Sequence, residues 1–232
     1  MTPPEPAVGV VVPTRNAVAY IGRALASVLS QEPPPADVVV VDAGSTDGTC
    51  EVVAATAGVR LVEQSGVGLG AARNQGVEAV AGELVAFCDA DDRWAPGALV
   101  VRMRHVLADP ACDAVIGSVV MEPIDGSDTP QAQIGRLGEP LPGFTPGALM
   151  ARRRTLERVG PFSEHLTIGT DSEWFVRLVQ SGLRCDRLDQ VVLHKGARAG
   201  SLSTDVTAYR RELLTVARSY VAHRRRRDRS GG

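Results

Sequence analysis

The chain has 232 residues, of which 44% are apolar and 4% aromatic, and its formal net charge is -2. This length allows one large domain or two small ones, and the nearly balanced charge argues against binding to nucleic acid. No apolar run approaches the roughly 18 residues of a membrane-spanning helix, and the first residues lack the pattern of a signal peptide. We therefore expect a soluble, cytoplasmic protein without a transmembrane segment.

The four cysteines, at positions 50, 88, 112 and 185, lie far apart in the sequence. No two have the CxxC spacing of a zinc cluster, and scattered thiols are typical of a reducing compartment. A catalytic cysteine needs an activating partner, and the sequence shows no obvious one. We expect neither a zinc cluster nor a cysteine nucleophile.

The first half of the chain alternates between two kinds of segment. Short apolar runs predict strands at residues 8–12, 38–41, 59–63, 84–88 and 114–120, of which those at 38–41 and 84–88 are expected to be buried. Helical spacing of apolar residues predicts helices at about residues 17–30, 49–57, 71–80 and 96–107. This alternation is the pattern of a mostly parallel α/β sheet flanked by helices, in which ligands bind beyond the carboxyl ends of the strands.

The second half is less regular. Residues 121–147 hold five prolines and five glycines, which predicts a long shaped loop. Further strands are expected at residues 148–151 and 191–193, and further helices at 153–159, 170–181 and 205–224. We find no internal repeat and expect a single domain whose second half completes the site of the first.

Polar clusters follow three of the predicted strands: "PTRN", "DAGSTDG" and "DADD". In the last of these, Asp89, Asp91 and Asp92 crowd three carboxylates together, which is costly unless a cation lies among them. Magnesium or manganese suits such a site because hard cations prefer oxygen ligands and bridge phosphates. The alternative is that Asp91 and Asp92 cap the helix that begins near Pro96.

A glycine loop precedes the third predicted helix. Gly66-x-Gly68-x-x-Ala71 has the form of a dinucleotide fingerprint, but it follows the third strand, whereas that fingerprint belongs to the first strand–helix turn. We therefore do not expect a nicotinamide cofactor. Arg73, just beyond the loop, can reach a phosphate or a base, or it is a solvated helix charge.

The segment "GTDSEWFVRL" opens a late helix. Thr170 and Glu173 have the spacing of a capping box, which explains both residues structurally. It does not explain Asp171, which the helix dipole keeps ionised and which can act as a general base near a substrate hydroxyl.

Charged residues also follow the last predicted strand and lie near the end of the chain. His194 ends the last predicted strand and precedes a basic, glycine-rich loop with Lys195 and Arg198. Either His194 is structural, or the loop folds over a diphosphate with His194 as a further metal ligand. The arginines at 224–227 form a solvated end or contact an anionic surface or acidic partner.

Taken together and in this order, the motifs resemble the family 2 glycosyltransferases with the glycosyltransferase-A fold. The matching stretches cover most of residues 8–194 and are "VVVPTRN", "VVVVDAGSTDGT", "GLGAARNQGVEAVAGELVAFCDADD" and "VGPFSEHLTIGTDSEWFVRLVQSG". The resemblance implies a single Rossmann-like α/β domain and a metal-dependent, inverting transfer of a hexose from a nucleoside-diphosphate sugar to an acceptor hydroxyl or other nucleophile. UDP is the nucleotide we expect, and the acceptor is unknown.

The resemblance also assigns roles to residues. Residues 8–120 would form the half that binds the nucleotide sugar. Residues 121–223 would form the half with the acceptor site and the catalytic base. A loose N-terminus (1–7) precedes the first half, and a basic tail (224–232) follows the second. Asp171 matches the catalytic base, and Asp91, with His194, would hold Mg²⁺ or Mn²⁺. The residues implied in donor binding are Pro13, Thr14, Arg15, Asp42, Arg73, Asp89, Ala90 and Asp91.

Two positions depart from the family pattern. Ala43 stands where a second aspartate is common, so base or donor preference is expected to differ. Thr170 stands where a glutamate often precedes the base, so acceptor recognition is expected to differ. Two other functions stay open: a sugar nucleotidyltransferase, whose first loop usually contains glycines that "VPTRN" lacks, and a non-catalytic nucleotide-sugar-binding protein.

Overall fold

The computed structural model describes residues 7–124 and 137–197. The predicted helix at 205–224 and the basic tail at 224–232 lie outside these residues, as do residues 1–6. The strands are β1 (Val8–Thr14), β2 (Asp37–Asp42), β3 (Arg60–Glu63), β4 (Leu84–Phe87), β5 (Arg93–Trp94), β6 (Ala114–Pro123), β7 (Leu141–Pro142), β8 (Leu149–Arg152) and β9 (Cys185–Ala197). The helices are α1 (Ile21–Leu29), α2 (Thr49–Ala54), α3 (Gly68–Ala79), α4 (Ala98–Ala108), η1 (Pro146–Ala148), α6 (Arg153–Val159) and α7 (Thr170–Gln180).

All strands belong to one sheet with the order β3-β2-β1-β4-β8-β6-β9-β5, and β7 pairs with β6. The strands β3, β2, β1 and β4 pair in parallel, as the strand–helix alternation predicts. From the second half, β8 pairs antiparallel with both β4 and β6, and β9 pairs parallel with β6; the short β5, from the first half, pairs antiparallel with β9. The predicted single α/β domain, with a central sheet flanked by helices, is confirmed; the sheet is parallel from β3 to β4 and mixed beyond β4.

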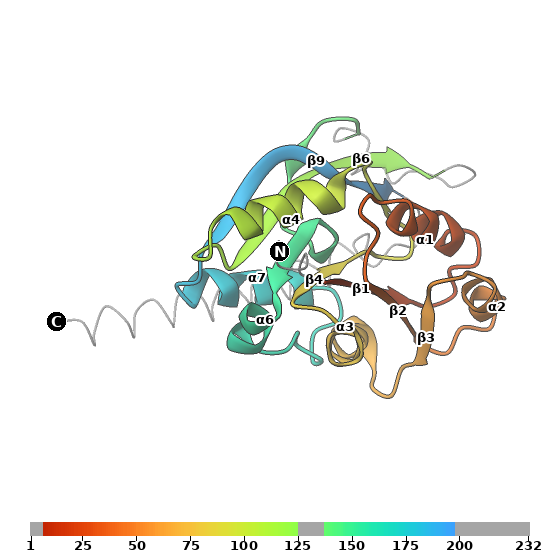
Figure 1. Cartoon of the computed structure of the whole chain (residues 1–232). Helices are drawn as coiled ribbons and strands as arrows, with labels where there is room; N and C mark the ends of the chain where they lie inside the picture. Colours follow the sequence, from red (N-terminus) through yellow and green to blue (C-terminus); the bar gives the residue numbers. More distant parts are fainter. Residues whose placement is uncertain (1–6, 125–136, 198–232) are drawn as a thin grey trace, which may run out of the picture.

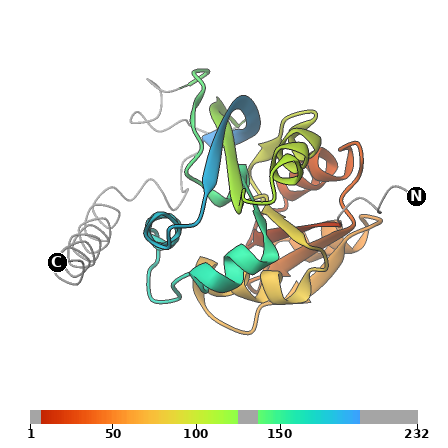
Figure 2. The same ribbon diagram turned by 60° about the vertical axis from the view of Figure 1, so that its left-hand side comes forward.

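Helices cover both faces of the sheet (Figures 1 and 2). Because successive residues of a strand point to opposite faces, β1 contributes to two cores. Val10 lies in one core with Leu25 of α1 and Leu99 of α4. Val11 lies in the other core with Trp174 of α7. Strands β1, β2 and β4 are therefore buried on both faces, and only their ends are left to carry polar groups, whereas the edge strand β3 is mostly exposed.

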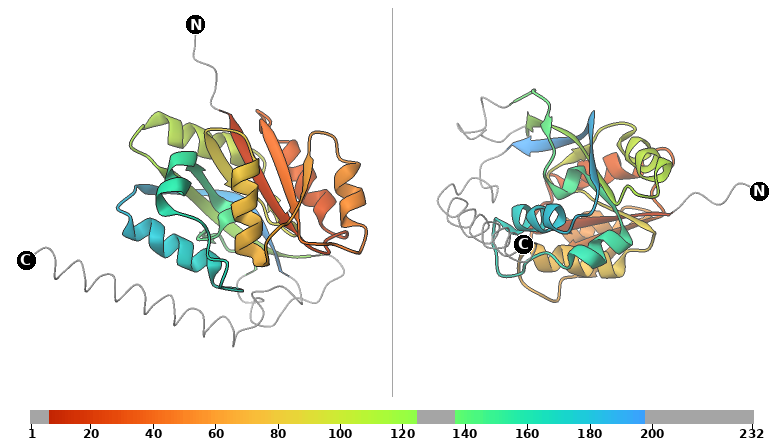
Figure 3. Two further views of the ribbon diagram at one scale, coloured as in Figure 1. Left: turned by 90° about the horizontal axis from the view of Figure 1, so that it is seen from below. Right: turned by 90° about the vertical axis from the view of Figure 1, so that its left-hand side faces the viewer.

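Helix α3 packs unusually close to the sheet (Figure 3). A Cβ atom on Gly76 would lie 2.2 Å from Cγ1 of Val11 in β1, and one on Gly70 would lie 2.3 Å from the carbonyl oxygen of Ser163. Small residues thus let α3 lie against β1 on one side and against the segment before α7 on the other. Arg73, between these two glycines, is completely buried as a result.

Several elements differ from their predicted bounds, and two of these differences lie near the strand ends that carry the polar clusters. Strand β9 is longer than the predicted residues 191–193. The sequence does not reveal its first part, which has no apolar alternation and pairs with β6 through register shifts on either side of Ser118. Helix α3 begins at Gly68, so the end of the glycine loop forms its first turn. In the described ranges, no helix combines the length and the apolar character that crossing a bilayer requires.

Candidate functional site

The polar clusters predicted at the strand ends do lie at one edge of the sheet. Thr14 ends β1 directly opposite Asp42, which ends β2. Phe87 of β4 pairs with Val11 of β1, which places the turn that begins at Cys88 beside the same edge. The three clusters therefore meet at the carboxyl ends of adjacent parallel strands, where such sheets bind ligands.

The first two clusters form a partly buried wall. Pro13 and Thr14 are buried, whereas Arg15 is exposed. The carboxylate of Asp42 is 5% exposed and accepts hydrogen bonds from the backbone N–H and the hydroxyl of Ser45, at 2.8 and 2.5 Å. The buried Thr14 hydroxyl has no hydrogen-bond partner among the residues that the structure describes. A bound ligand can supply the missing hydrogen bond to this hydroxyl.

Arg73 joins the two halves of the chain. Its Nη2 donates to Oδ1 of Asp89 at 2.9 Å, and its Nη1 contacts Oδ1 of Asp171 at the start of α7. Its guanidinium also lies over the ring of Phe162, 5.6 Å from the centroid. The alternative that Arg73 is a solvated helix charge is wrong, because α3 packs so close to the sheet that the side chain is fully buried.

The charges of these groups are strongly coupled. Burial disfavours the charge of Asp89, but Arg73 and Lys195 outweigh that effect, and the pKa of Asp89 is lowered. Burial raises the pKa of Asp171, an effect that Arg73 opposes and Asp89 reinforces. Asp171 is thus a stronger base than an exposed aspartate, and 24% of its side chain is exposed. These are properties that a general base needs.

Thr170 and Glu173 do not form the predicted capping box. The N-cap of α7 is Gly169, and Thr170 is already inside the helix. The hydroxyl of Thr170 instead donates to the carbonyl oxygen of Ser163, and Glu173 pairs with Arg177 one turn later. Thr170 thus binds a carbonyl group before the helix, and Glu173 binds an arginine of the same helix, so neither side chain is left for the predicted cap.

Asp92 does not cap a helix either. The N-cap of α4 is Gly97, and the N–H of Leu99 in its first turn donates to Oε1 of Gln31 at 3.0 Å. The Asp92 side chain is 1% exposed. Its Oδ1 accepts the N–H of Gly196 at 2.9 Å, and its Oδ2 lies 3.4 Å from Nζ of Lys195. Burial and the nearby charges of Asp91 and Asp89, opposed by Lys195, raise the pKa of Asp92 to about 7.

His194 lies next to Lys195 in β9 and opposite Arg93 of β5. Its Nδ1 is 2.6 Å from Oε1 of Glu122, whose other oxygen pairs with Arg93. The glutamate therefore orients the imidazole ring, as a second-shell carboxylate does for a metal-binding histidine. The metal-binding roles of Asp91 and His194 stay predictions.

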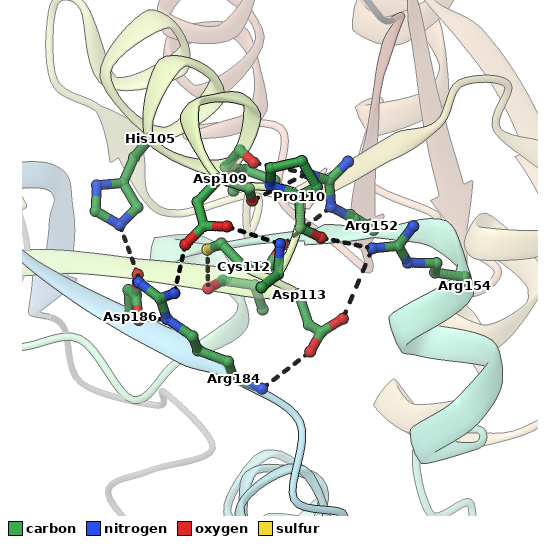
Figure 4. Close-up of polar contacts among 12 residues, drawn as sticks. His105, Asp109, Pro110, Cys112, Asp113, Arg152, Arg154, Arg184 and Asp186 are labelled. Carbon is green, nitrogen blue, oxygen red and sulfur yellow. Dashed lines mark hydrogen bonds and ion pairs between the residues drawn. The ribbon is translucent and has the colours of Figure 1, made fainter.

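A second cluster of titratable groups lies at the start of β9 (Figure 4). His105, Cys112 and Asp186 place one ligand atom each within 4.8 Å of one another, and they are the only such group of three in residues 7–124 and 137–197. Arg184 already binds both oxygens of Asp186, at 2.7 and 2.8 Å, and His105 Nε2 lies 2.9 Å from Oδ2. These two partners lower the pKa of Asp186 to about 2. We interpret the cluster as an ion-pair network that joins α4 to β9.

The structure gives three residues of the candidate site roles that the sequence did not assign to them. Ser45 holds Asp42. Asp92, predicted as part of a cation site or as a helix cap, anchors the end of β9, and Lys195, named only as part of a basic loop that folds over a diphosphate, brings a cation among the acids. Its contact with Asp92 joins residues 103 positions apart, so no local pattern reveals it.

Comparison with protein families gives one match, which covers most of the chain. Residues 9–170 match the model of glycosyl transferase family 2. An uncharacterized glycosyltransferase of Nostoc sp. is 33% identical over 174 residues, which are 66% of this chain and 53% of the relative. Glycosyltransferase AglE of Haloferax volcanii is 30% identical over 208 residues, which are 78% of this chain and 64% of the relative. The chain thus spans between half and two thirds of the length of these relatives.

Solved structures share the fold. TarS of S. aureus (residues 1–349, in complex with UDP-GlcNAc) superposes with a TM-score of 0.69 at 22% identity, over 94% of this chain and 66% of that chain. Mannosyl-3-phosphoglycerate synthase from Rubrobacter xylanophilus superposes with a TM-score of 0.64 at 20% identity, over 96% of this chain and 75% of that chain. At these identities the likeness concerns the fold alone.

Proposed function

The chain belongs to glycosyl transferase family 2, and from this premise we propose that it transfers a sugar from a nucleoside-diphosphate sugar to an acceptor hydroxyl, with inversion at the anomeric carbon. The observation that carries this proposal is the contact of Arg73 with both Asp89 and Asp171. It places a carboxylate with a raised pKa next to the strand ends where a nucleotide would bind.

The donor would lie along the strand ends. Pro13, Thr14 and Arg15 would line the nucleoside pocket, and the unpartnered Thr14 hydroxyl offers a hydrogen bond there. Asp42, held by Ser45, would read the base. UDP is the nucleotide we expect, because TarS, which shares the fold, was solved with UDP-GlcNAc.

The diphosphate end of the donor would meet a charged environment. Arg73, which is fully buried and paired with Asp89 and Asp171, would act on the base and the diphosphate through its charge, and Asp89 and Ala90 would face the ribose side. Ala90 is buried in the turn, which limits it to a backbone contact or to shaping the pocket.

The residues present fit a hard divalent cation. Four carboxylates, those of Asp89, Asp91, Asp92 and Asp171, share the site with two basic groups, those of Arg73 and Lys195, so negative charge is in excess. Mg²⁺ or Mn²⁺ is commonly held by one or two carboxylates together with substrate phosphates. Asp91, with His194, would hold the ion. When bound, the ion would neutralise charge that develops on the departing diphosphate.

The chemistry would centre on Asp171. It would take the proton from the acceptor hydroxyl, whose oxygen forms a bond to the anomeric carbon. The bond from that carbon to the diphosphate oxygen breaks, and the nucleoside diphosphate leaves with the electron pair. Arg73 holds Oδ1 of Asp171 and thereby orients the carboxylate. No second acid is needed because the leaving group is already an anion.

The replacement of Asp171 by asparagine tests this role. Asp171→Asn keeps the shape and one acceptor oxygen for Arg73 but removes the base, so donor binding should persist. The release of UDP from the UDP-sugar in the presence of acceptor should fall by about a hundredfold or more, the scale of a lost general base. Unchanged turnover in the variant would remove Asp171 from this role.

Two other functions are less well supported. A sugar nucleotidyltransferase usually needs a glycine-rich first loop for a triphosphate, and the first strand here ends in Pro13 and Thr14. A non-catalytic binding protein would not need a buried carboxylate at the position of Asp171.

The remaining assignments concern the rest of the chain. We propose that residues 8–120 bind the donor and that residues 121–223 shape the acceptor site. For the arginines at 224–227, the more specific of the two hypotheses is contact with an anionic surface. A cytoplasmic location remains an expectation.

A further inference from the structure

Lys195 lies among the acids of the candidate site. Its Nζ is 3.4 Å from Oδ2 of Asp92 and 4.0 Å from Oδ2 of Asp89. An ammonium group has three N–H donors, and among the described residues only Asp92 lies within hydrogen-bonding distance of it. The side chain is 29% exposed. Lys195 therefore has N–H donors left for an anionic ligand, and its side chain is accessible to such a ligand.

The backbone fixes this lysine in place. The N–H of Gly196 donates to Oδ1 of Asp92, so the same carboxylate holds two consecutive residues of β9. A Cβ atom on Gly196 would lie 2.3 Å from the carbonyl oxygen of Asp91. Only a glycine lets the strand approach the turn this closely. Lys195 is thus built into the site and is not a freely moving surface lysine.

Neutralising Asp92 does not by itself explain the position of Lys195. The Nζ atom also lies 4.0 Å from Oδ2 of Asp89, so the ammonium group is placed between two carboxylates of the site. A diphosphate that enters this site meets several carboxylates, and it needs fixed positive charge to offset their repulsion.

We propose that Lys195 binds the diphosphate of the donor and shares this work with the metal ion, so that nucleotide binding survives in part without metal. The inference rests on the proposed function and adds to it a residue outside the predicted metal ligands. Since Lys195 and the ion would both neutralise the same phosphates, the loss of either should matter most when the other is absent.

The test is calorimetric titration of the full chain. Wild type is first titrated with UDP, GDP, ADP, CDP and dTDP, and the nucleoside diphosphate that binds is then compared with its nucleoside, in EDTA and in Mn²⁺. Lys195→Gln should bind the diphosphate about tenfold or more weakly in EDTA, the scale of a lost charge-assisted hydrogen bond. The loss should be smaller in Mn²⁺, and nucleoside affinity should not change.

Two further variants separate ligand binding from folding. Lys195→Arg keeps the charge and should bind the diphosphate within a few-fold of wild type. The double variant Asp92→Asn, Lys195→Gln removes the buried carboxylate together with the lysine that neutralises it. The loss of diphosphate affinity should persist in this double variant.

Equal diphosphate affinity in wild type and Lys195→Gln would overturn the inference and leave the proposed function intact. Restored affinity in the double variant would also overturn it, because Lys195 would then act only on Asp92. A folded wild type that binds none of the five nucleotides, with metal or without, would instead refute the proposed function.

Discussion

The guanidinium group of Arg73 contacts carboxylates from both halves of the chain, Asp89 after β4 and Asp171 in α7. Its side chain is fully buried, and the two carboxylates are 17% and 24% exposed. When one partner of a buried ion pair is removed, the remaining charge is left uncompensated, which costs more than the pair contributes. The stability of the fold and the geometry of the site therefore depend on the same residue.

Arg73→Met should lower the free energy of unfolding by about 3 kcal/mol. The reason is that Asp89 and Asp171 then lose their shared cation. Urea denaturation measures the change, and Arg158→Met is the matched control, because Arg158 is exposed in the last turn of α6 and should change stability by less than about 0.5 kcal/mol. An equal loss in both variants would contradict the role given to Arg73.

Asp91→Ala should weaken the metal-dependent part of nucleoside-diphosphate binding. The carboxylate is the proposed link between the protein and the ion, so removing it should bring affinity in Mn²⁺ close to affinity in EDTA. Titration of both proteins under both conditions measures this. If metal makes no difference to wild type either, the metal-dependent part of the proposal is wrong.

At the scale of elements, β9 connects two clusters of charge. Its start carries Asp186, which pairs with His105 of α4, and its end carries Lys195 and Gly196, which bind Asp92. The strand is held to β6 along most of its length. A change at its end should therefore act on the aspartate turn without unfolding the strand.

Gly196→Ala should weaken nucleoside-diphosphate binding. The added Cβ atom would lie 2.3 Å from the carbonyl oxygen of Asp91, so the strand end and the turn must move apart. Gly22→Ala in α1 is the control, since the nearest atom to its Cβ is 3.8 Å away and alanine favours a helix. That variant should bind as wild type does and be equally or more stable. Unimpaired binding in Gly196→Ala would show that the close approach is not needed.

Asp186→Asn should remove a pH-dependent part of stability. Arg184 and His105 lower the pKa of Asp186 from 3.8 to about 2. A carboxyl group whose pKa is lower in the folded than in the unfolded protein stabilises the fold at pH values above its unfolded pKa. This contribution is lost as pH falls from about 4 towards 2. The difference in unfolding free energy between wild type and variant should therefore shrink over this window in urea titrations. A difference that stays constant between pH 5 and 2 would contradict this explanation.

At the scale of the whole molecule, the sequence predicts most of the described elements in both halves, but it predicts the pairing of the strands only in the first half. Strand–helix alternation marks β1 to β4 because each buried strand is a short apolar run bounded by turn residues. The pairing of β8 with β4 and of β9 with β6 joins segments far apart in the chain, and β9 begins with polar residues. Such pairings depend on tertiary contacts that no local pattern contains.

The candidate site divides in the same way. Asp42, Asp89 and Asp91 were predicted because parallel strands bring their carboxyl ends to one edge. Lys195 was named only as part of a basic loop that folds over a diphosphate, because its place among the acids depends on how β9 packs against the aspartate turn. For Asp92 a cation site and a helix cap were both left open, because its actual partner, Gly196, is 104 positions away. Sequence reasoning thus identified the acids of the site but not the contact that brings Lys195 among them.

The central claim is that this edge of the sheet binds a nucleoside diphosphate with the help of a divalent metal ion. Titration of the folded wild-type chain with the five nucleoside diphosphates, in Mn²⁺ and in EDTA, tests it most directly. We predict that one nucleotide, UDP, binds and that Mn²⁺ tightens its binding. If the folded protein binds none of them under either condition, the claim that this is a nucleotide-sugar site is wrong.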